Sequence, residues 1–403
     1  MTVDYSPFAP EVRDDPYPYY KRLRDEAPVY RVEPFGIYAV SRYDDVMNIV
    51  KNPEIFSSKA IQSFLLGNLV AESMSEEERE IFQSPILIST DAPEHTRMRN
   101  LVNRGFTPKR IAALETRIRE ITRQALDQID PTDFDLVRDL NVPLPVTVIA
   151  ELLGVESERI TDFKRWSDAI VGGISGTDEE SKQLFTESRG QFRAYFKEVV
   201  ERRRREPGDD LISVLVRAEE DLGVLTPAQI LGFTLLLLVA GNETTTNLIG
   251  NTMLALLNNP AQLEKAAADP TLIPGMIEEG LRFDSPIQGL VRTPTRDTEL
   301  HGVSIPKEAV VMILFASANH DERQFADPDR FDLTRNSQGH LAFGYGTHYC
   351  LGSSLARLET RVAFEELLAR FRNFEMIQDH TERIDSFLIR GPRSLRMRAE
   401  PAS

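Results

Sequence analysis

The sequence predicts a mainly α-helical protein with a small β part. Apolar residues recur at helical spacing through most of residues 93–219. A helix of roughly 30 residues follows Pro227, and at about 1.5 Å per residue it would span about 45 Å. Segments with β-type alternation are short and lie near residues 29–40 and 297–315. Helices therefore outnumber strands in any fold that this chain can adopt.

The first expected elements belong to the N-terminal quarter. An extended arm with four prolines precedes a short helix at 19–26, a β-hairpin at 29–40 and a second helix at 43–51. Residues 52–90 read as an irregular segment with an apolar patch, and such long loops are usually functional or disordered. Six helices then follow, at residues 93–104, 112–129, 142–153, 158–172, 181–205 and 209–219.

The long helix has clear boundary signals. Thr226 is a plausible N-cap, and Pro227 suits the first helical turn. The pattern continues to about Asn258, and a helix of this length in a soluble enzyme is usually central and buried. Two helices follow at 260–267 and 272–283, then β-rich segments, a helix at 351–370, and strands and turns to the end.

Composition excludes several classes of protein. Of the 403 residues 41% are hydrophobic and 27% are charged, so the chain can bury a large core. A net charge of −16 would repel nucleic acid and anionic lipid, and we predict neither as a partner. No segment reaches the roughly 20 apolar residues of a membrane span, and the first residues do not resemble a signal peptide. We expect one cytoplasmic domain, residues 1–403, because no linker or repeat divides the chain.

Cys350 is the only cysteine, which excludes an intramolecular disulfide, a CxxC redox pair and a multi-cysteine zinc site. A lone cysteine is more often a small buried apolar residue than a functional group. The apolar positions after Cys350 recur at helical spacing, so Cys350 lies at a helix N-terminus, which favours a thiolate. Gly344, Gly346 and Gly352 permit a tight loop that a flat cofactor can approach.

Such a thiolate suits either a soft metal or a nucleophile. A nucleophilic cysteine requires a positioned base. His348 lies two residues away, but nothing marks an Asp or Asn that would orient it. The residues around the cysteine decide between the two roles.

The loop matches the pattern Phe-x-x-Gly-x-x-x-Cys-x-Gly at Phe343, Gly346, Cys350 and Gly352, and on this pattern the chain resembles the bacterial soluble branch of the cytochrome P-450 family. The resemblance covers essentially the whole chain. It implies a triangular prism with a haem b between the long central helix and the helix after the cysteine. It also implies that Cys350 is the iron ligand, whose electron donation favours O–O cleavage. The further cofactor-binding residues implied are His95, Arg99, Ala240, Gly241, Thr244, Arg292, Phe343, Gly344, His348, Gly352 and Ala356.

Within the long helix stands Ala-Gly-Asn-Glu-Thr-Thr, residues 240–245. Glycine and threonine weaken a helix, and they can also open a helical turn. The resemblance makes this segment the oxygen-binding groove, in which Thr244 hydrogen-bonds dioxygen and Glu243 relays protons. Many relatives carry His where Asn242 stands, but the acid and the alcohol remain.

Two further comparisons with the family concern residues that take no part in the chemistry. Glu279, Arg282 and Arg330 match the family positions of a buried charge network, although Glu-x-x-Arg alone is a weak signal on a helix. At Glu308 the family often has glycine, for a turn with positive φ, so we expect the turn to bend differently here.

The substrate-contacting regions implied by the family are predominantly apolar, so we expect a hydrophobic, largely uncharged small molecule. These regions are Ile61–Val70, Ile170–Gly176, Leu236–Ala240, Ile287–Val291 and Phe387–Ile389. Several of these side chains can equally fill the core. Steroids, terpenoids, fatty acids and polyketides all remain open.

The implied reaction inserts one oxygen atom from O2 into a C–H bond or an alkene of the substrate. Electrons must come from outside, because the chain has no flavin or iron–sulfur domain, and we expect a ferredoxin or similar donor and a monomeric enzyme. A basic patch for an acidic donor would comprise Arg97, Arg104, Lys109, Arg110 and Arg357, unless these are solvated helix surface. The alternatives are a peroxide-driven hydroxylase and a haem-based sensor or carrier without turnover.

Overall fold

The structure is a computed structural model that describes residues 3–66, 79, 81, 84–175, 179–222, 225–378 and 380–402. The chain forms two compact units. The first consists of Met1–Ser57, Leu114–Leu144 and Thr244–Ser403, and the second of Ser58–Ala113 and Pro145–Glu243. Helices predominate in both, and the strands of the described residues all belong to the first unit. The predicted fold class, mainly α with small sheets, is confirmed. A single domain over residues 1–403 stays a prediction.

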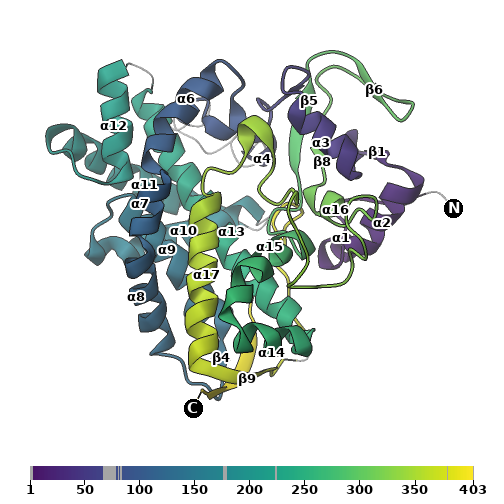
Figure 1. Ribbon diagram of the computed structural model, residues 1–403. Coiled ribbons are helices and arrows are strands. Elements are labelled where there is room, and N and C mark those ends of the chain that lie inside the picture. The colour runs from purple at the N-terminus through teal and green to yellow at the C-terminus, as the bar shows by residue number, and fades with distance from the viewer. Residues whose placement is uncertain are drawn as a thin grey trace. The chain divides into compact units, whose positions relative to one another are not determined.

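Figure 1 shows the elements of the first unit. Its helices are α1 (Pro10–Asp14), α2 (Tyr17–Glu26), α3 (Tyr43–Lys51), α8 (Glu115–Leu126), α14 (Pro260–Ala268), α15 (Ile273–Phe283), α16 (Phe315–Asn319) and α17 (Ser353–Arg370). Its strands are β1 (Val29–Val32), β2 (Ile37–Val40), β3 (Phe56–Ser57), β4 (Phe134–Asp135), β5 (Leu290–Pro294), β6 (Thr298–Leu300), β7 (Val303–Ile305), β8 (Val311–Ile313), β9 (Phe371–Met376) and β10 (Arg396–Pro401).

The largest sheet has the order β1-β2-β8-β5-β3. The β1–β2 hairpin was predicted, and Gly36 in its turn has a φ of +66°, which glycine adopts without strain. Strand β2 pairs in parallel with β8, and the other neighbours are antiparallel. Val40 and Ile313 face each other across β2 and β8, and both are completely buried. This sheet and α3 enclose one apolar core of the first unit.

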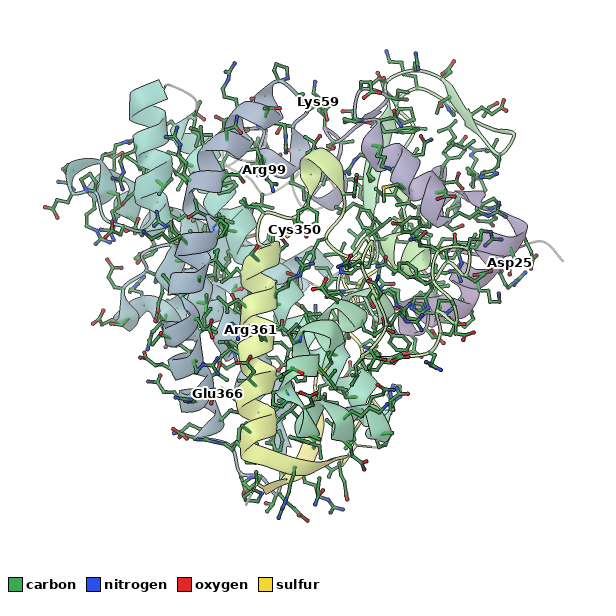
Figure 2. The ribbon with its side chains drawn as sticks, viewed as in Figure 1. Asp25, Lys59, Arg99, Cys350, Arg361 and Glu366 are labelled. Carbon is green, nitrogen blue, oxygen red and sulfur yellow. The ribbon has the colours of Figure 1, made fainter. Side chains whose placement is uncertain are left out.

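Helix α17 carries the residues that follow the cysteine loop, and it lies between α8 and α15 (Figure 1). Ion pairs join it to α8. Arg119 on α8 contacts Glu365 at 2.6 Å and Glu366 at 2.7 Å, and Arg361 on α17 contacts Glu115 at 2.8 Å. Figure 2 labels Arg361 and Glu366 on α17, below Cys350. These ion pairs hold α17 in a fixed position along α8.

The regular elements of the second unit are all helices in its described residues. It contains α4 (Ile61–Leu66), α6 (Glu94–Val102), α7 (Pro108–Ala113), most of α9 (Pro143–Leu152), α10 (Ile160–Ser175), α11 (Glu179–Arg205) and α12 (Leu211–Leu222). Helices α10 and α11 pack through an aromatic cluster, in which Phe192 and Phe196 have ring centroids 4.5 Å apart and Trp166 is 1% exposed. Trp166 also donates a hydrogen bond from Nε1 to Gln191 at 2.9 Å.

The longest helix, α13 (Pro227–Leu257), begins in the second unit and ends in the first. Its predicted cap is confirmed, because Thr226 Oγ1 accepts a hydrogen bond from the Gln229 amide at 3.2 Å. The Gln229 side chain in turn accepts one from the Thr226 amide at 2.9 Å, which completes a capping box. The helix continues through residues 240–245 without a break. Of the described helices, α13 included, none has the length and apolar character of a membrane span.

Two N-terminal predictions were wrong. Residues 52–90 were expected to be irregular, but Ile61–Leu66 form the helix α4. The arm before α2 was expected to be extended, but residues Pro10–Asp14 form the short helix α1. Pro10 begins it, because proline needs no amide partner at that place and its φ already suits a helix. Glu11 in the first turn and Arg13 in the last turn also suit the helix dipole.

Candidate active site

The cysteine loop, residues 340–352, is closed by hydrogen bonds between its own backbone groups. The Cys350 amide donates to the Phe343 carbonyl at 2.9 Å, and the Tyr349 amide donates to the Gly346 carbonyl at 3.0 Å. Gly344 and Gly346 have φ values of +67° and +69°, a conformation that a side chain would strain. Cys350 lies three residues before the start of α17, at its N-terminal end (Figure 2), which agrees with the position predicted for it.

Space around the loop fits a flat cofactor. Cys350 is only half-buried, and so is Gly352. A methyl group added at Gly352 would meet no atom of the described residues within 4 Å. A half-buried cysteine two residues from such an open position suits a large planar group whose metal it binds.

Helix α13 presents one accessible face although most of the helix is buried. Ala240 is exposed, and Gly241, Glu243 and Thr244 are half-buried. Their neighbours Asn242 and Thr245 are each 3% exposed. Asn242 lies away from that face, because its amide donates to Ser167 Oγ on α10 at 2.7 Å. Glu243 and Thr244, the predicted acid and alcohol, therefore both lie on the accessible side of α13. Asn242 has a structural role, because it joins α13 to α10.

The four basic residues among the predicted cofactor-binding residues divide between the two units. Arg292 on β5 and His348 belong to the first unit, and Arg292 is 5% exposed and donates to the Val291 carbonyl at 2.8 Å. His95 and Arg99 belong to the second unit and share a face of α6. His95 is 1% exposed, and burial together with the Arg99 charge lowers its pKa, so it is neutral near pH 7.

The buried charge network differs from its prediction in one member. Glu279 and Arg282 on α15 are both fully buried, and two hydrogen bonds of 2.8 Å join them. Arg330 is not the third partner, because its side chain is 66% exposed and pairs with Asp332. Arg335 takes that place, with Nε 3.1 Å from Glu279 Oε1. Burial alone would raise the pKa of Glu279, but its hydrogen bonds and the Arg282 charge hold the pKa below its usual value.

A second network was missed by sequence reasoning. Glu278, the neighbour of Glu279, binds Arg357 on α17 and His340 in the cysteine loop. Arg357 was predicted to belong to a basic patch, and its contact with Glu278 was not predicted. Nothing in the local sequence indicates this link, since 79 residues separate Glu278 from Arg357.

The predicted substrate-contacting segments are only partly described. Residues 67–70 and 176 lie outside the described residues. Of the others, Val291 is 1% exposed and fills the core. Phe387 is half-buried and packs against Phe8 in a tilted arrangement, with ring centroids 4.9 Å apart. Ile287 and Ile389 form an antiparallel bridge, which brings two of the predicted segments together.

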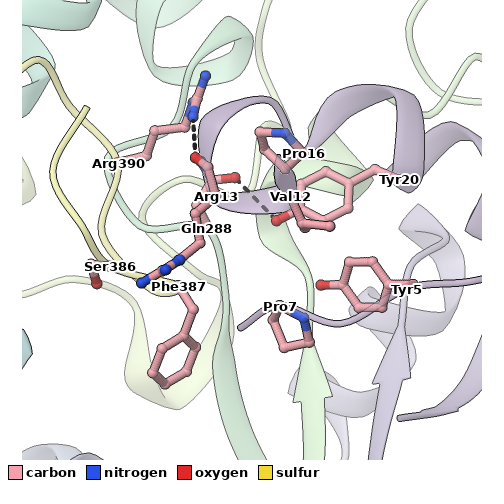
Figure 3. A pocket seen from close by; sticks show the side chains of 10 residues that line it. All are labelled: Tyr5, Pro7, Val12, Arg13, Pro16, Tyr20, Gln288, Ser386, Phe387 and Arg390. Carbon is pink, nitrogen blue, oxygen red and sulfur yellow. Dashed lines mark hydrogen bonds between the residues drawn. The ribbon is translucent and has the colours of Figure 1, made fainter. Parts of the chain in front are cut away.

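A buried polar hub holds those two segments to the N-terminal arm. Arg390 contacts Asp284 at 3.0 Å and donates to the carbonyls of Arg13 and Asp14 at 2.9 and 2.8 Å. Beside it lies a cavity of about 10 Å³, the space of one water. Figure 3 shows the side chains around this cavity, which are those of Tyr5, Pro7, Val12, Arg13, Pro16, Tyr20, Gln288, Ser386, Phe387 and Arg390.

Comparison with known proteins identifies the family. The family model described as Cytochrome P450 matches residues 148–397. The steroid C26-monooxygenase of Mycobacterium tuberculosis is 36% identical over 362 residues, 89% of this chain and 87% of that protein. The structure of cytochrome P450 CYP109Q5 from Chondromyces apiculatus is 42% identical, covers 100% of both chains and has a TM-score of 0.90. That of CYP109E1 from Bacillus megaterium in complex with corticosterone is 37% identical, covers 96% of this chain and 99% of that one, and has a TM-score of 0.85.

These likenesses extend over the whole chain, so the predicted fold and reaction class are confirmed. The protein is a haem-thiolate monooxygenase that acts on a small molecule and receives electrons from a redox partner. The chain belongs to the cytochrome P450 family.

Proposed function

We propose that Cys350 binds the iron of a haem b and that the enzyme oxidises steroid-like substrates with electrons from a ferredoxin. The observation that carries the proposal is the place of Cys350, at the N-terminus of α17 and beside the open space at Gly352. The helix N-terminus favours the thiolate form. When bound, the haem supplies the activation of dioxygen.

The remaining residues of the site hold the cofactor and handle protons. His95, Arg99, Arg292 and His348 would hold the propionates, and Ala240, Gly241, Phe343, Gly344 and Ala356 would line the ring. Thr244 holds the dioxygen substrate through its hydroxyl, and Glu243 moves protons to the same place. Both residues are half-buried on the open face of α13, where their protons can exchange with solvent. This pair supports dioxygen rather than peroxide as the oxidant.

The substrate class follows from the apolar character of the described segments. Leu236 on α13, Leu290 on β5 and Phe387 are all half-buried apolar residues in segments expected to contact substrate. The CYP109E1 structure contains corticosterone, a compact and mostly apolar molecule. A steroid of this kind would find apolar contacts here without leaving a charge buried and unpaired.

The electron donor would dock at the surface of the cysteine loop. Tyr345 is 45% exposed and Tyr349 is 38% exposed, which is unusual for such large side chains. Lys51 stands 5.3 Å from the centre of the Tyr345 ring and adds a positive charge. Aromatic and cationic side chains together suit an acidic ferredoxin.

Arg357, which was predicted to belong to a basic patch, contributes no free charge to this surface because Glu278 neutralises it. The other four residues of the predicted basic patch belong to the second unit. We further propose that the enzyme is a cytoplasmic monomer.

The experiment combines spectra with turnover. The reduced, carbon-monoxide-bound wild type should show the strongly red-shifted Soret band of a thiolate ligand, and Cys350→Ser should lose it. Testosterone should then be hydroxylated in the presence of a ferredoxin, its reductase and NADPH. Product formed only with hydrogen peroxide would instead support the peroxide-driven enzyme. Reductant consumption without product across a lipophilic panel would support a sensor.

A further inference from the structure

We propose that Glu278 is a positioning residue that holds the cysteine loop and sets the electrostatic field at the Cys350 sulfur. This inference rests on the proposed ligation by Cys350. It concerns a carboxylate on α15 that acts on the cysteine loop through Arg357 and His340. Three groups of contacts, all within the first unit, carry the argument.

The first group is a double hydrogen bond to α17. Arg357 Nε lies 2.6 Å from Glu278 Oε1, and Arg357 Nη2 lies 2.9 Å from Glu278 Oε2. This two-point pairing fixes the plane of the guanidinium as well as its place. Since Arg357 lies on α17, about two helical turns after Cys350, Glu278 anchors the beginning of that helix to α15.

The second group lies between Arg357 and the loop. The guanidinium stands over the Phe343 ring, 4.5 Å from its centre, and Nη1 donates to the Tyr349 hydroxyl at 3.2 Å. Phe343 provides the carbonyl that binds the Cys350 amide. Arg357 thus contacts residues on both sides of the loop closure, and Glu278 holds Arg357 in that place.

The third group involves His340. Its Nδ1 accepts the Ala342 amide hydrogen at 3.2 Å, which leaves Nε2 as the donor to Glu278 Oε2 at 3.0 Å. The imidazole side chain is 4% exposed, and its ring centre is 6.1 Å from that of Phe343. Glu278 therefore holds the start of the loop through His340 and its end through Arg357.

The charge balance of this clamp (Glu278, Arg357 and His340) matters for the sulfur. Burial alone would raise the pKa of Glu278, but the hydrogen bonds from Arg357 and His340 outweigh burial and hold it at about 2. The carboxylate is therefore charged and cancels the charge of Arg357. Without it, an unbalanced cation would stand over Phe343, and a cation near a thiolate and its iron favours the more reduced state.

The test measures the midpoint potential of the haem iron and the fraction of thiolate-type band in the reduced carbon-monoxide complex. Glu278→Gln should shift the potential in the positive direction, because Arg357 loses its counter-charge. Arg357→Gln should shift it in the negative direction, because Glu278 is then left uncompensated. The double variant should return close to the wild-type value.

Glu366→Gln is the matched control. Glu366 also pairs with two arginines, Arg119 and Arg123, but it lies much farther along α17 from Cys350 (Figure 2). The Glu366→Gln variant should leave the midpoint potential and the thiolate-type band unchanged. Glu278→Gln should also convert part of the thiolate-type band to the form that lacks thiolate ligation, while the control does not.

Equal potentials in Glu278→Gln, Arg357→Gln and wild type would overturn the proposal, and so would shifts of the same sign in both single variants. If Glu278→Gln fails to fold, the sign of the Arg357→Gln shift and the double variant still decide. Failure of the underlying function is separate, since it appears as a wild-type protein whose reduced carbon-monoxide complex lacks the thiolate-type band.

Discussion

Tyr17 donates a hydrogen bond of 2.7 Å to Asp284, across 267 residues of sequence. Asp284 also pairs with Arg390, so this contact ties α2 to the hub beside the predicted substrate-contacting segments. Burial alone would raise the pKa of Asp284, but Arg390 and Arg383 hold it below its usual value, and the carboxylate is charged. A hydroxyl that binds a buried charge is worth more than an ordinary hydrogen bond.

Tyr17→Phe should lower the free energy of unfolding by roughly 2 kcal/mol, because one acceptor site of a buried carboxylate is left empty. Denaturant titration followed by circular dichroism measures the change. Tyr19→Phe, at a half-buried position on the same helix, should stay within about 0.5 kcal/mol of wild type. Equal effects of the two changes would show that the Asp284 contact contributes nothing.

The corrected charge network gives a second prediction. Arg335→Ala should lower the unfolding free energy by roughly 3 kcal/mol, since it removes a partner of the fully buried Glu279. Arg330→Ala should change it by less than about 0.5 kcal/mol, because that side chain is 66% exposed. The reverse order in a thermal or denaturant experiment would support the original prediction from sequence.

Glu359 on α17 predicts a pH dependence. It is 2% exposed, burial raises its pKa to about 8, and Oε2 accepts no hydrogen bond from the described residues. Below its ordinary pKa the carboxyl is neutral in both states and costs nothing. As pH rises from about 4.5 to 8, only the unfolded chain ionises, so stability falls, by roughly 3 kcal/mol at pH 7. Above about 8 the loss is complete and constant.

Glu359→Gln should therefore match wild type near pH 4.5 and become progressively more stable than it up to about pH 8. Denaturant midpoints across this pH range measure the difference. Glu299→Gln, at an exposed position on β6, is the control and should give a difference that does not grow with pH. A constant offset for Glu359→Gln would mean that the carboxyl titrates normally.

Glu308 adopts a φ of +66°, so the turn keeps the left-handed conformation for which the family uses glycine. The expectation of a differently bent turn was wrong. Glu308→Gly should raise the unfolding free energy by about 1 kcal/mol through release of backbone strain. Lys307→Gly, next to it but outside the left-handed positions, should instead destabilise the protein. A melting temperature that falls in both variants would contradict the strain argument.

Thr244→Ala should lower the amount of product formed per NADPH consumed, because the variant lacks the hydroxyl that we propose holds dioxygen. Product and NADPH are measured in the same reaction with a steroid substrate. Thr234→Ala on the same helix is the control, since its hydroxyl binds the Ile230 carbonyl at 2.8 Å. An unchanged ratio in Thr244→Ala would exclude a role in proton delivery.

Local signals were sufficient for much of the molecule. The cap at Thr226, the hairpin at Gly36 and the position of Cys350 before α17 depend on residues a few positions apart, and all agree with the structure. The accessible side of α13 at Ala240 and Thr244 also agrees with the family motif.

The predictions failed where the partner is distant in sequence. Arg330 and Arg335 lie in the same irregular segment between α16 and α17, and only the packing of α15 decides that Arg335 reaches Glu279. The sequence around Glu278 does not distinguish it from other helix carboxylates, because its partner Arg357 is 79 residues away. Long-range pairing of charges is set by how helices pack, and charge spacing along a sequence does not report it.

The adjacency of Glu278 and Glu279 has a consequence for unfolding. One turn of α15 anchors the segment around Arg335 through Glu279 and the cysteine loop through Glu278. Neither anchor can be released without loosening the same turn. The cysteine loop and that segment should therefore come apart in one cooperative step, with loss of the thiolate-type spectrum and of tertiary structure at the same denaturant concentration.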